Sequence, residues 1–123
     1  MRLSLPIGYL ISWILSLKEL LDQAKITYHG VKLNAADWSD QSHAIAFSVE
    51  SLSQTTYMHI MINAYFGTLE FEVPVLGSSG RIWRQWMDTG KASPADIYEW
   101  GKGPEFAESH ISVEGRSIVI LVS

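Results

Sequence analysis

The sequence predicts an all-β fold, an antiparallel two-sheet β-sandwich of Greek-key type with one added N-terminal α-helix. Beyond Ala24 the helical period stops, and short runs of alternating apolar and polar residues begin. Turn-forming clusters separate these runs, and no further helical pattern lies between them. Several antiparallel strands in about 100 residues, without intervening helices, are typical of a two-sheet sandwich.

Residues 1–25 form a segment of their own, ahead of a domain over residues 26–123. Residues 3–17 are uncharged, as in a signal peptide, but no small-x-small cleavage site follows them. This stretch is also shorter than the roughly 20 residues that cross a bilayer. We expect a helix over residues 9–24 that lies on the domain; a segment lacking its natural partner, and membrane or export, are the alternatives. Apolar residues recur there at helical spacing, at Ile14, Leu17, Leu21 and Ala24.

The first strands follow from alternation with a period of two. A short strand over residues 26–28 leads into a polar loop over residues 34–43. In residues 44–49 large apolar side chains alternate with alanine and serine, so the two kinds face opposite sides of the strand. Residues 57–63 form another strand, whose expected core face comprises Met58, Ile60 and Ile62.

The next strand covers residues 69–73, where leucine, phenylalanine and valine alternate with glutamate. Pro74 ends it, because proline cannot donate a hydrogen bond to a strand ladder. Residues 82–88 read as a further strand. Residues 89–103 carry four glycines or prolines and are expected to form a long, ordered loop.

The closing strand has the most informative pattern. Residues 118–122 are apolar without a break, whereas a strand with one face in water alternates. Both faces therefore require cover, from the helix over residues 9–24 or from another domain, since an open apolar face marks a contact surface. We expect this strand to pair with residues 111–113 in a tight hairpin, because Gly115 in the connection tolerates positive φ.

The composition excludes several classes of function. The net charge is -4 and the nine lysines and arginines are scattered, so no basic stripe is available to nucleic acid. The absence of cysteine removes disulfides and thiolate chemistry and fits a reducing compartment, so we expect a cytoplasmic protein. A chain of 123 residues is less than half of the roughly 250 that a (β/α)₈ barrel needs. We predict no cofactor and no membrane partner.

Catalytic and metal sites find little support. Glu70 and Glu72 share a strand face, as a glycosidase pair would, but this alternation is typical of a solvated face. No G-x-S-x-G elbow exposes a serine nucleophile. The histidines show neither close spacing nor an H-E-x-x-H element, so we expect no metal site. The residues considered are His29, His43, His59 and His110, with Asp37, Asp40 and Asp96.

The tryptophans raise a carbohydrate-binding alternative. Trp38, Trp83, Trp86 and Trp100, with Tyr98, could stack on sugar rings, because their amphipathic rings suit such faces. Trp83 and Trp86 are three residues apart, so on one strand they face opposite sides. Packing within the core or between loops is the favoured interpretation for these side chains, and contact with an α-glucan is the alternative.

Four pieces in order carry a family resemblance. They are ITYHGVKLNAADWSDQSHAIAF, MINAYFGTLEFEVP, WRQWMDTGKASPAD and VEGRSIVILVS. Together they span residues 26–123 and resemble the C-terminal β-sandwich domain of isoamylase-type glycogen and starch debranching enzymes of the α-amylase superfamily. Two departures stand out: Tyr28 occupies a position where the family usually has tryptophan, and residues 1–25 do not read like the end of a barrel.

The resemblance implies a non-catalytic accessory domain, detached or truncated, that packs on and stabilises a catalytic barrel. Parent enzymes of this kind hydrolyse α-1,6 branches with an aspartate nucleophile and a glutamate acid/base, which lie in the barrel and have no counterpart here. The expected partner is such a barrel, or a second copy of the chain, through the apolar closing strand. A stand-alone α-glucan-binding module is the alternative function.

Overall fold

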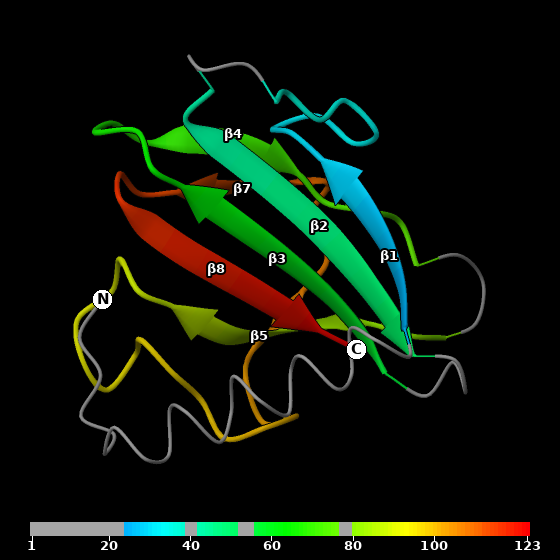
Figure 1. The fold of residues 1–123 in the computed structure, drawn as a ribbon. Coiled ribbons are helices and arrows are strands. Elements are labelled where there is room, and N and C mark those ends of the chain that lie inside the picture. Colours follow the sequence, from blue (N-terminus) through cyan, green and yellow to red (C-terminus); the bar gives the residue numbers. More distant parts are fainter. Residues whose placement is uncertain (1–23, 39–41, 52–55, 77–79) are drawn as a thin grey trace.

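A computed structural model describes residues 24–38, 42–51, 56–76 and 80–123 of the chain (Figure 1). These residues form two antiparallel sheets and contain no helix, which confirms the expected class of sandwich. The predicted helix over residues 9–24 lies outside the described residues, apart from Ala24, which begins the first strand. No helix in the described part of the chain has the length and hydropathy to span a bilayer.

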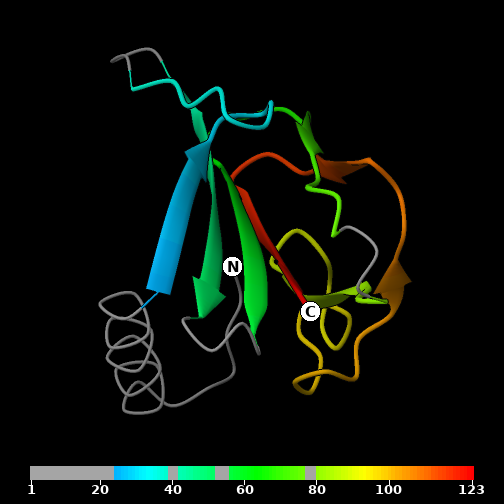
Figure 2. The same cartoon turned by 90° about the vertical axis from the view of Figure 1, so that its right-hand side faces the viewer.

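The six-stranded sheet has the order β1-β2-β3-β8-β5-β6, and the two-stranded sheet pairs β4 with β7. Figure 1 shows the large sheet from its face, with β8 between β3 and β5. Figure 2 shows the molecule turned, with the small sheet standing to one side of the large one. The strands are β1 (Ala24–His29), β2 (Ala44–Ser51), β3 (Tyr57–Asn63), β4 (Leu69–Glu72), β5 (Trp83–Asp88), β6 (Glu105–Phe106), β7 (His110–Val113) and β8 (Ser117–Val122).

The core between the two sheets is an apolar cluster that we call the inner cluster. Phe71 and Val113 enter it from the small sheet, and Met61 and Leu121 enter it from the large sheet, all fully buried. Interdigitation of the two inner faces is the usual way in which a sandwich buries its core. The buried members of the inner cluster are Ala46, Met61, Phe71, Val73, Trp83, Val113, Val119 and Leu121.

A second apolar cluster, the outer cluster, lies on the face of the large sheet that is turned away from β4 and β7. In β8, Val119 and Leu121 belong to the inner cluster, whereas Ile120 and Val122 belong to the outer cluster. All four side chains are buried, so the prediction that both faces of the closing strand are covered is confirmed. The buried members of the outer cluster are Val49, Met58, Ile60, Trp86, Met87, Ile120 and Val122.

The predicted hairpin between residues 111–113 and the closing strand is wrong. β7 pairs with β4 in the small sheet, whereas both edges of β8 are occupied by β3 and β5. A strand that is apolar on both faces is most stable inside the large sheet, so no edge of β8 remains for β7. In the connection it is Arg116 that has positive φ, 55°, whereas Gly115 is required because a Cβ there would overlap the Phe66 carbonyl.

The strand over residues 57–63 is present, and Met58 and Ile60 are buried in a hydrophobic cluster as predicted, but this cluster lies on the face turned away from the small sheet. Met58 and Ile60 lie in the outer cluster, and His59 and Met61 face the small sheet. Both sets of side chains are buried, so apolar character alone did not reveal which face meets the second sheet. The polar residues of β3 point inward because the inner face supplies hydrogen-bond partners for them.

Candidate functional site

The four candidate tryptophans do not form one platform. Trp83 and Trp86 are 4% and 8% exposed and belong to the inner and the outer cluster, respectively. The Trp83 indole Nε1–H donates to the Pro74 carbonyl at 2.8 Å, which satisfies its polar atom inside the core. These two rings therefore act in packing, on opposite faces of the sheet as the sequence predicts.

A β-bulge in β5 places Trp86 and Met87 on the same side of the sheet, both in the outer cluster. Gln85 pairs with Leu121 and Met87 pairs with Ile120, so the ladder skips Trp86. Two residues of β5 then face one residue of β8. Period-two alternation from Trp83 predicts Trp86 on the outer side but Met87 on the inner side, so the sequence pattern does not indicate the bulge.

Trp38 and Trp100 are the exposed members of the set, at 67% and 51%. Trp38 packs edge-on against Tyr28, near the end of β1, with ring centroids 5.4 Å apart. Trp100 packs edge-on against Trp86, with ring centroids 4.9 Å apart. In the strand register Tyr28 and Met87, the neighbour of Trp86, lie in one row, but β2, β3 and β8 stand between their strands. Trp38 lies beside Ile45 and Ile62, whereas Trp100 lies beside Val122 toward the other end of these strands, so the two rings line separate hollows.

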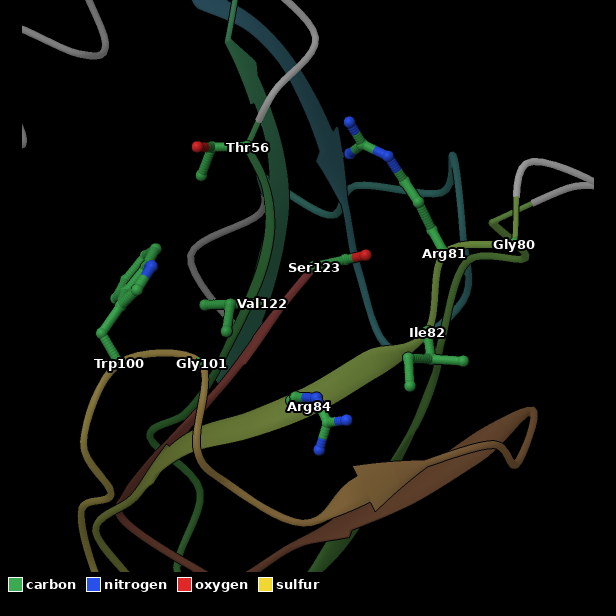
Figure 3. A pocket seen from close by; sticks show the side chains of 9 residues that line it. All are labelled: Thr56, Gly80, Arg81, Ile82, Arg84, Trp100, Gly101, Val122 and Ser123. Atoms are coloured by element: carbon green, nitrogen blue, oxygen red, sulfur yellow. The ribbon is translucent and has the colours of Figure 1, made fainter.

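A groove of about 360 Å³ lies beside Trp100 (Figure 3). Figure 3 shows Trp100 on one side of it and Ile82 on the other, with Val122 and Arg84 between them. Val122 and Arg84 are partners in the ladder between β8 and β5, so the floor of the groove is part of the sheet. Its lining residues are Thr56, Gly80, Arg81, Ile82, Arg84, Trp100, Gly101, Val122 and Ser123.

The Arg84 guanidinium is fixed on this floor by two contacts. Its Nη1 donates to the Gly103 carbonyl at 3.1 Å, and its Nη2 lies 3.2 Å from Glu105 Oε1. Gly103 has to be a glycine because a Cβ would overlap the carbonyl of Gln85, and this close approach brings the loop onto β5. The guanidinium is therefore held in position, the Arg84 side chain is 35% exposed, and Arg84 is one of the lining residues of the groove.

The long loop over residues 89–103 is ordered against the sheet, as the sequence predicts. Asp88 Oδ1 accepts a hydrogen bond from the Gly90 amide at 3.0 Å, and the Asp88 amide donates to the Asp96 carbonyl at 2.9 Å. Ile97 forms a bridge with Met87, and the Tyr98 amide donates to the Trp86 carbonyl. These contacts position Trp100 at the rim of the groove.

Two of the four histidines meet in a buried hydrogen-bond chain. The Asn34 amide donates to His29 Nδ1 at 2.7 Å, which leaves the proton of the neutral ring on Nε2. That Nε2–H donates to Ser48 Oγ at 3.0 Å, and the Ser48 hydroxyl donates to His59 Nδ1 at 3.0 Å. The chain thus has one direction, and it ties β1 and the following loop to β2 and β3.

The end of this chain is the His59 Nε2–H, which is buried and has no hydrogen-bond partner among the described residues. Burial lowers the pKa of His59 from 6.5 to about 4, and electrostatic repulsion from the nearby His29 ring lowers it further within this shift. The Glu72 backbone acts in the other direction, raising the pKa, and only partly offsets these two causes. Burial also lowers the pKa of His29. Both rings are therefore neutral at pH 7, and their role in this geometry is structural.

The other polar candidates are separated. His43 packs near the Tyr65 ring, with centroids 5.7 Å apart, and His110 Nε2 lies 3.9 Å from Glu72 Oε2. Glu72 Oε1 accepts a hydrogen bond from the Leu33 amide at 2.8 Å, whereas Glu70 is exposed. No group of three or more potential metal ligands occurs among the residues that the structure describes.

The comparisons with known proteins agree with the fold and with the quoted sequence pieces. No curated protein matches this chain. A family model described as Isoamylase 1-3, C-terminal, matches residues 27–115. The match contains all four candidate tryptophans, two of the four pieces in full and the first piece except for Ile26, and it ends shortly before β8. Because the matched range is more than half of the sequence, the chain belongs to the family of isoamylase 1-3 C-terminal domains.

Proposed function

We propose that this chain is a non-catalytic accessory domain of a glycogen debranching enzyme, and that it packs on and stabilises a catalytic barrel. The family match supports a place after the catalytic part of an isoamylase-type enzyme. The chain itself is too short for the roughly 250 residues of such a barrel. Hydrolysis of α-1,6 branches is then the activity of the barrel, to which this domain contributes stability.

The observation that carries the proposal is the outer cluster. The small sheet packs against the inner face of the large sheet only, yet the outer face is also apolar across four neighbouring strands. Phe47 and Ile62 flank the outer cluster and are half-buried, and Tyr28 beside Phe47 is exposed. The buried cluster thus has an apolar rim that is partly open to solvent, and apolar surface of this kind supports a contact with another protein.

The position of β8 decides how such a contact would form. Both edges of β8 are paired with neighbouring strands, so its backbone cannot add a strand from a partner. The partner therefore contacts the side chains of the sheet face rather than a strand edge.

The test uses an isoamylase from which its own C-terminal domain has been deleted. We expect the purified chain to form a complex with this truncated enzyme in size-exclusion chromatography and to raise its melting temperature. Phe47→Gln, on the outer face, should weaken the complex. The matched control is Phe66→Gln, since Phe66 is 76% exposed and lies on the loop after β3.

Three outcomes contradict the proposal. The first is failure of the unmodified chain to bind the truncated enzyme. The second is equal loss of binding in both phenylalanine variants, and the third is release of linear chains from glycogen by the chain alone in a contaminant-controlled assay. If the chain self-associates and Phe47→Gln abolishes this, the partner on the outer face is a second copy of the chain. That result would also overturn the proposal that a catalytic barrel packs there.

A further inference from the structure

The groove beside Trp100 combines a fixed aromatic ring with fixed polar groups. Trp86 supports the Trp100 ring edge-on at 4.9 Å between centroids, and the Lys102 amide closes the turn by donating to the Glu99 carbonyl at 2.9 Å. The ring is thus held by its neighbours although about half of it is exposed. A positioned indole of this kind offers an apolar face to a sugar ring at little entropic cost.

The polar side of the groove offers several hydrogen-bond donors, because Arg81 and Arg84 both line it. The carboxylate of Glu105, outside the lining, lies 3.2 Å from Arg84 Nη2 and compensates the charge of that guanidinium. The Arg84 guanidinium has more N–H groups than its two contacts use, and the Glu105 oxygens next to it can accept. Neighbouring donors and acceptors match the vicinal hydroxyls of a sugar, which both donate and accept hydrogen bonds.

The volume of the groove and its lining residues agree with binding of a sugar. The volume of about 360 Å³ falls in the range of about 300–1,000 Å³ that is usual for small-molecule sites. Val122 and Ile82 supply apolar surface, and Thr56, across the groove from Ile82, adds a hydroxyl. The Thr56 backbone is fixed, because the Ser51 amide donates to its carbonyl at 3.0 Å.

We propose that this groove is a surface site for a neutral oligosaccharide, with one sugar ring on Trp100 and its hydroxyls on the Arg84–Glu105 pair. The choice of α-glucan among oligosaccharides rests on the proposed function in a debranching enzyme, whereas the groove itself rests on the contacts above. The site would hold substrate near the catalytic barrel, or keep the isolated domain on a glucan particle.

The experiment is an NMR titration of the complete ¹⁵N-labelled chain with maltoheptaose, without any barrel. We expect shifts of the Trp100 indole N–H, the Arg84 side-chain N–H and the Gly101 amide, and none of the Trp38 indole N–H. Trp100→Ala should weaken binding by about tenfold, the scale of one lost aromatic contact. Trp38→Ala is the matched control, because Trp38 is even more exposed and lies toward the other end of the sheet.

Amide spectra of both variants establish that they are folded, since neither ring is buried in the core. Absence of shifts at about 10 mM maltoheptaose, well above weak dissociation constants of about 1 mM, would overturn the site. So would shifts centred on Trp38, or equal binding by Trp100→Ala. If inorganic phosphate displaces maltoheptaose and shifts the Arg84 side-chain N–H, the groove is a site for an anion and the proposal of a neutral sugar is wrong.

Cellohexaose tests the identity of the sugar. Binding of cellohexaose at Trp100 without binding of maltoheptaose would support the groove and overturn the choice of α-glucan. Failure of the barrel complex leaves this titration unaffected, because the titration contains no barrel. The two proposals can therefore fail independently.

Discussion

The two faces of the large sheet are stabilised in different ways. The inner face combines apolar residues with buried polar groups that have specific partners, such as Asn63 and the chain through His29, Ser48 and His59. The buried members of the outer cluster are aliphatic residues, methionines and one tryptophan. Directional hydrogen bonds fix the register and the connections, whereas non-directional burial allows a partner to be exchanged. The inner face thus specifies the fold, and the apolar rim of the outer face is where the proposed association would occur.

The largest expected effect tests the inner face at Asn63. Its Nδ2 donates to the carbonyls of Gly67, Val113 and Glu114 at 2.9–3.2 Å, and its Oδ1 accepts from the Tyr65 amide. Asn63→Ala leaves these groups without their partner, and we expect a loss of about 3–5 kcal/mol in the free energy of unfolding. Urea denaturation measures it, with Ser112→Ala on the exposed side of β7 as control; a loss below about 1 kcal/mol would refute the assignment.

A smaller difference in stability is expected between two alanine variants of β8, one on each face of the strand. Leu121 is fully buried in the inner cluster, and Ile120 is its neighbour in the outer cluster. Leu121→Ala should cost about 3–4 kcal/mol and Ile120→Ala about 2–3 kcal/mol, because the cavity between two sheets collapses less readily. Chemical denaturation of both variants decides this. An equal or reversed order would show that the outer face is as tightly enclosed as the inner one.

The smallest effect is a pH dependence that belongs to the inner face. The pKa of His59 is lowered to about 4 in the fold, so the unfolded chain binds its proton at higher pH than the native chain does. The stabilisation is complete above pH 6.5 and is lost as the pH falls toward 4, by about 2 kcal/mol at about pH 5. Denaturation between these pH values should show this slope in the wild type and a flatter one in His59→Leu. Parallel slopes would exclude His59 as the source.

The sequence was a good guide wherever a pattern depends on burial alone. Alternation located the strands over residues 44–51 and 57–63, and the unbroken apolar run at 118–122 predicted a strand with two covered faces. Pairing between distant strands was harder to predict. Residues 111–113 favour a hairpin locally, and only competition with β3 and β5 for the edges of β8 places them in the other sheet.

The candidate site was predictable only in part. Composition identified Trp100, and three-residue spacing separated Trp83 from Trp86, but the contact between Trp86 and Trp100 depends on how the loop over residues 89–103 returns to β5, which alternation cannot indicate. Arg84 and Glu105 are 21 residues apart, and the histidine chain joins three strands. Such groups meet through the fold, so residue spacing in the sequence contains no information about them.

The extra residue of β5 affects one side of the large sheet and leaves the other side unchanged. Because the ladder resumes in phase at Met87, Trp86 is an insertion that changes the outer side of the sheet and leaves the alternation of the inner side intact. Omitting it would remove the support of the Trp100 ring without altering which side chains Leu121 and Val119 meet across the strand pair. The cost of losing Trp86 would therefore fall on the outer cluster and on the support of the Trp100 ring, while the contacts between the two sheets stay as they are.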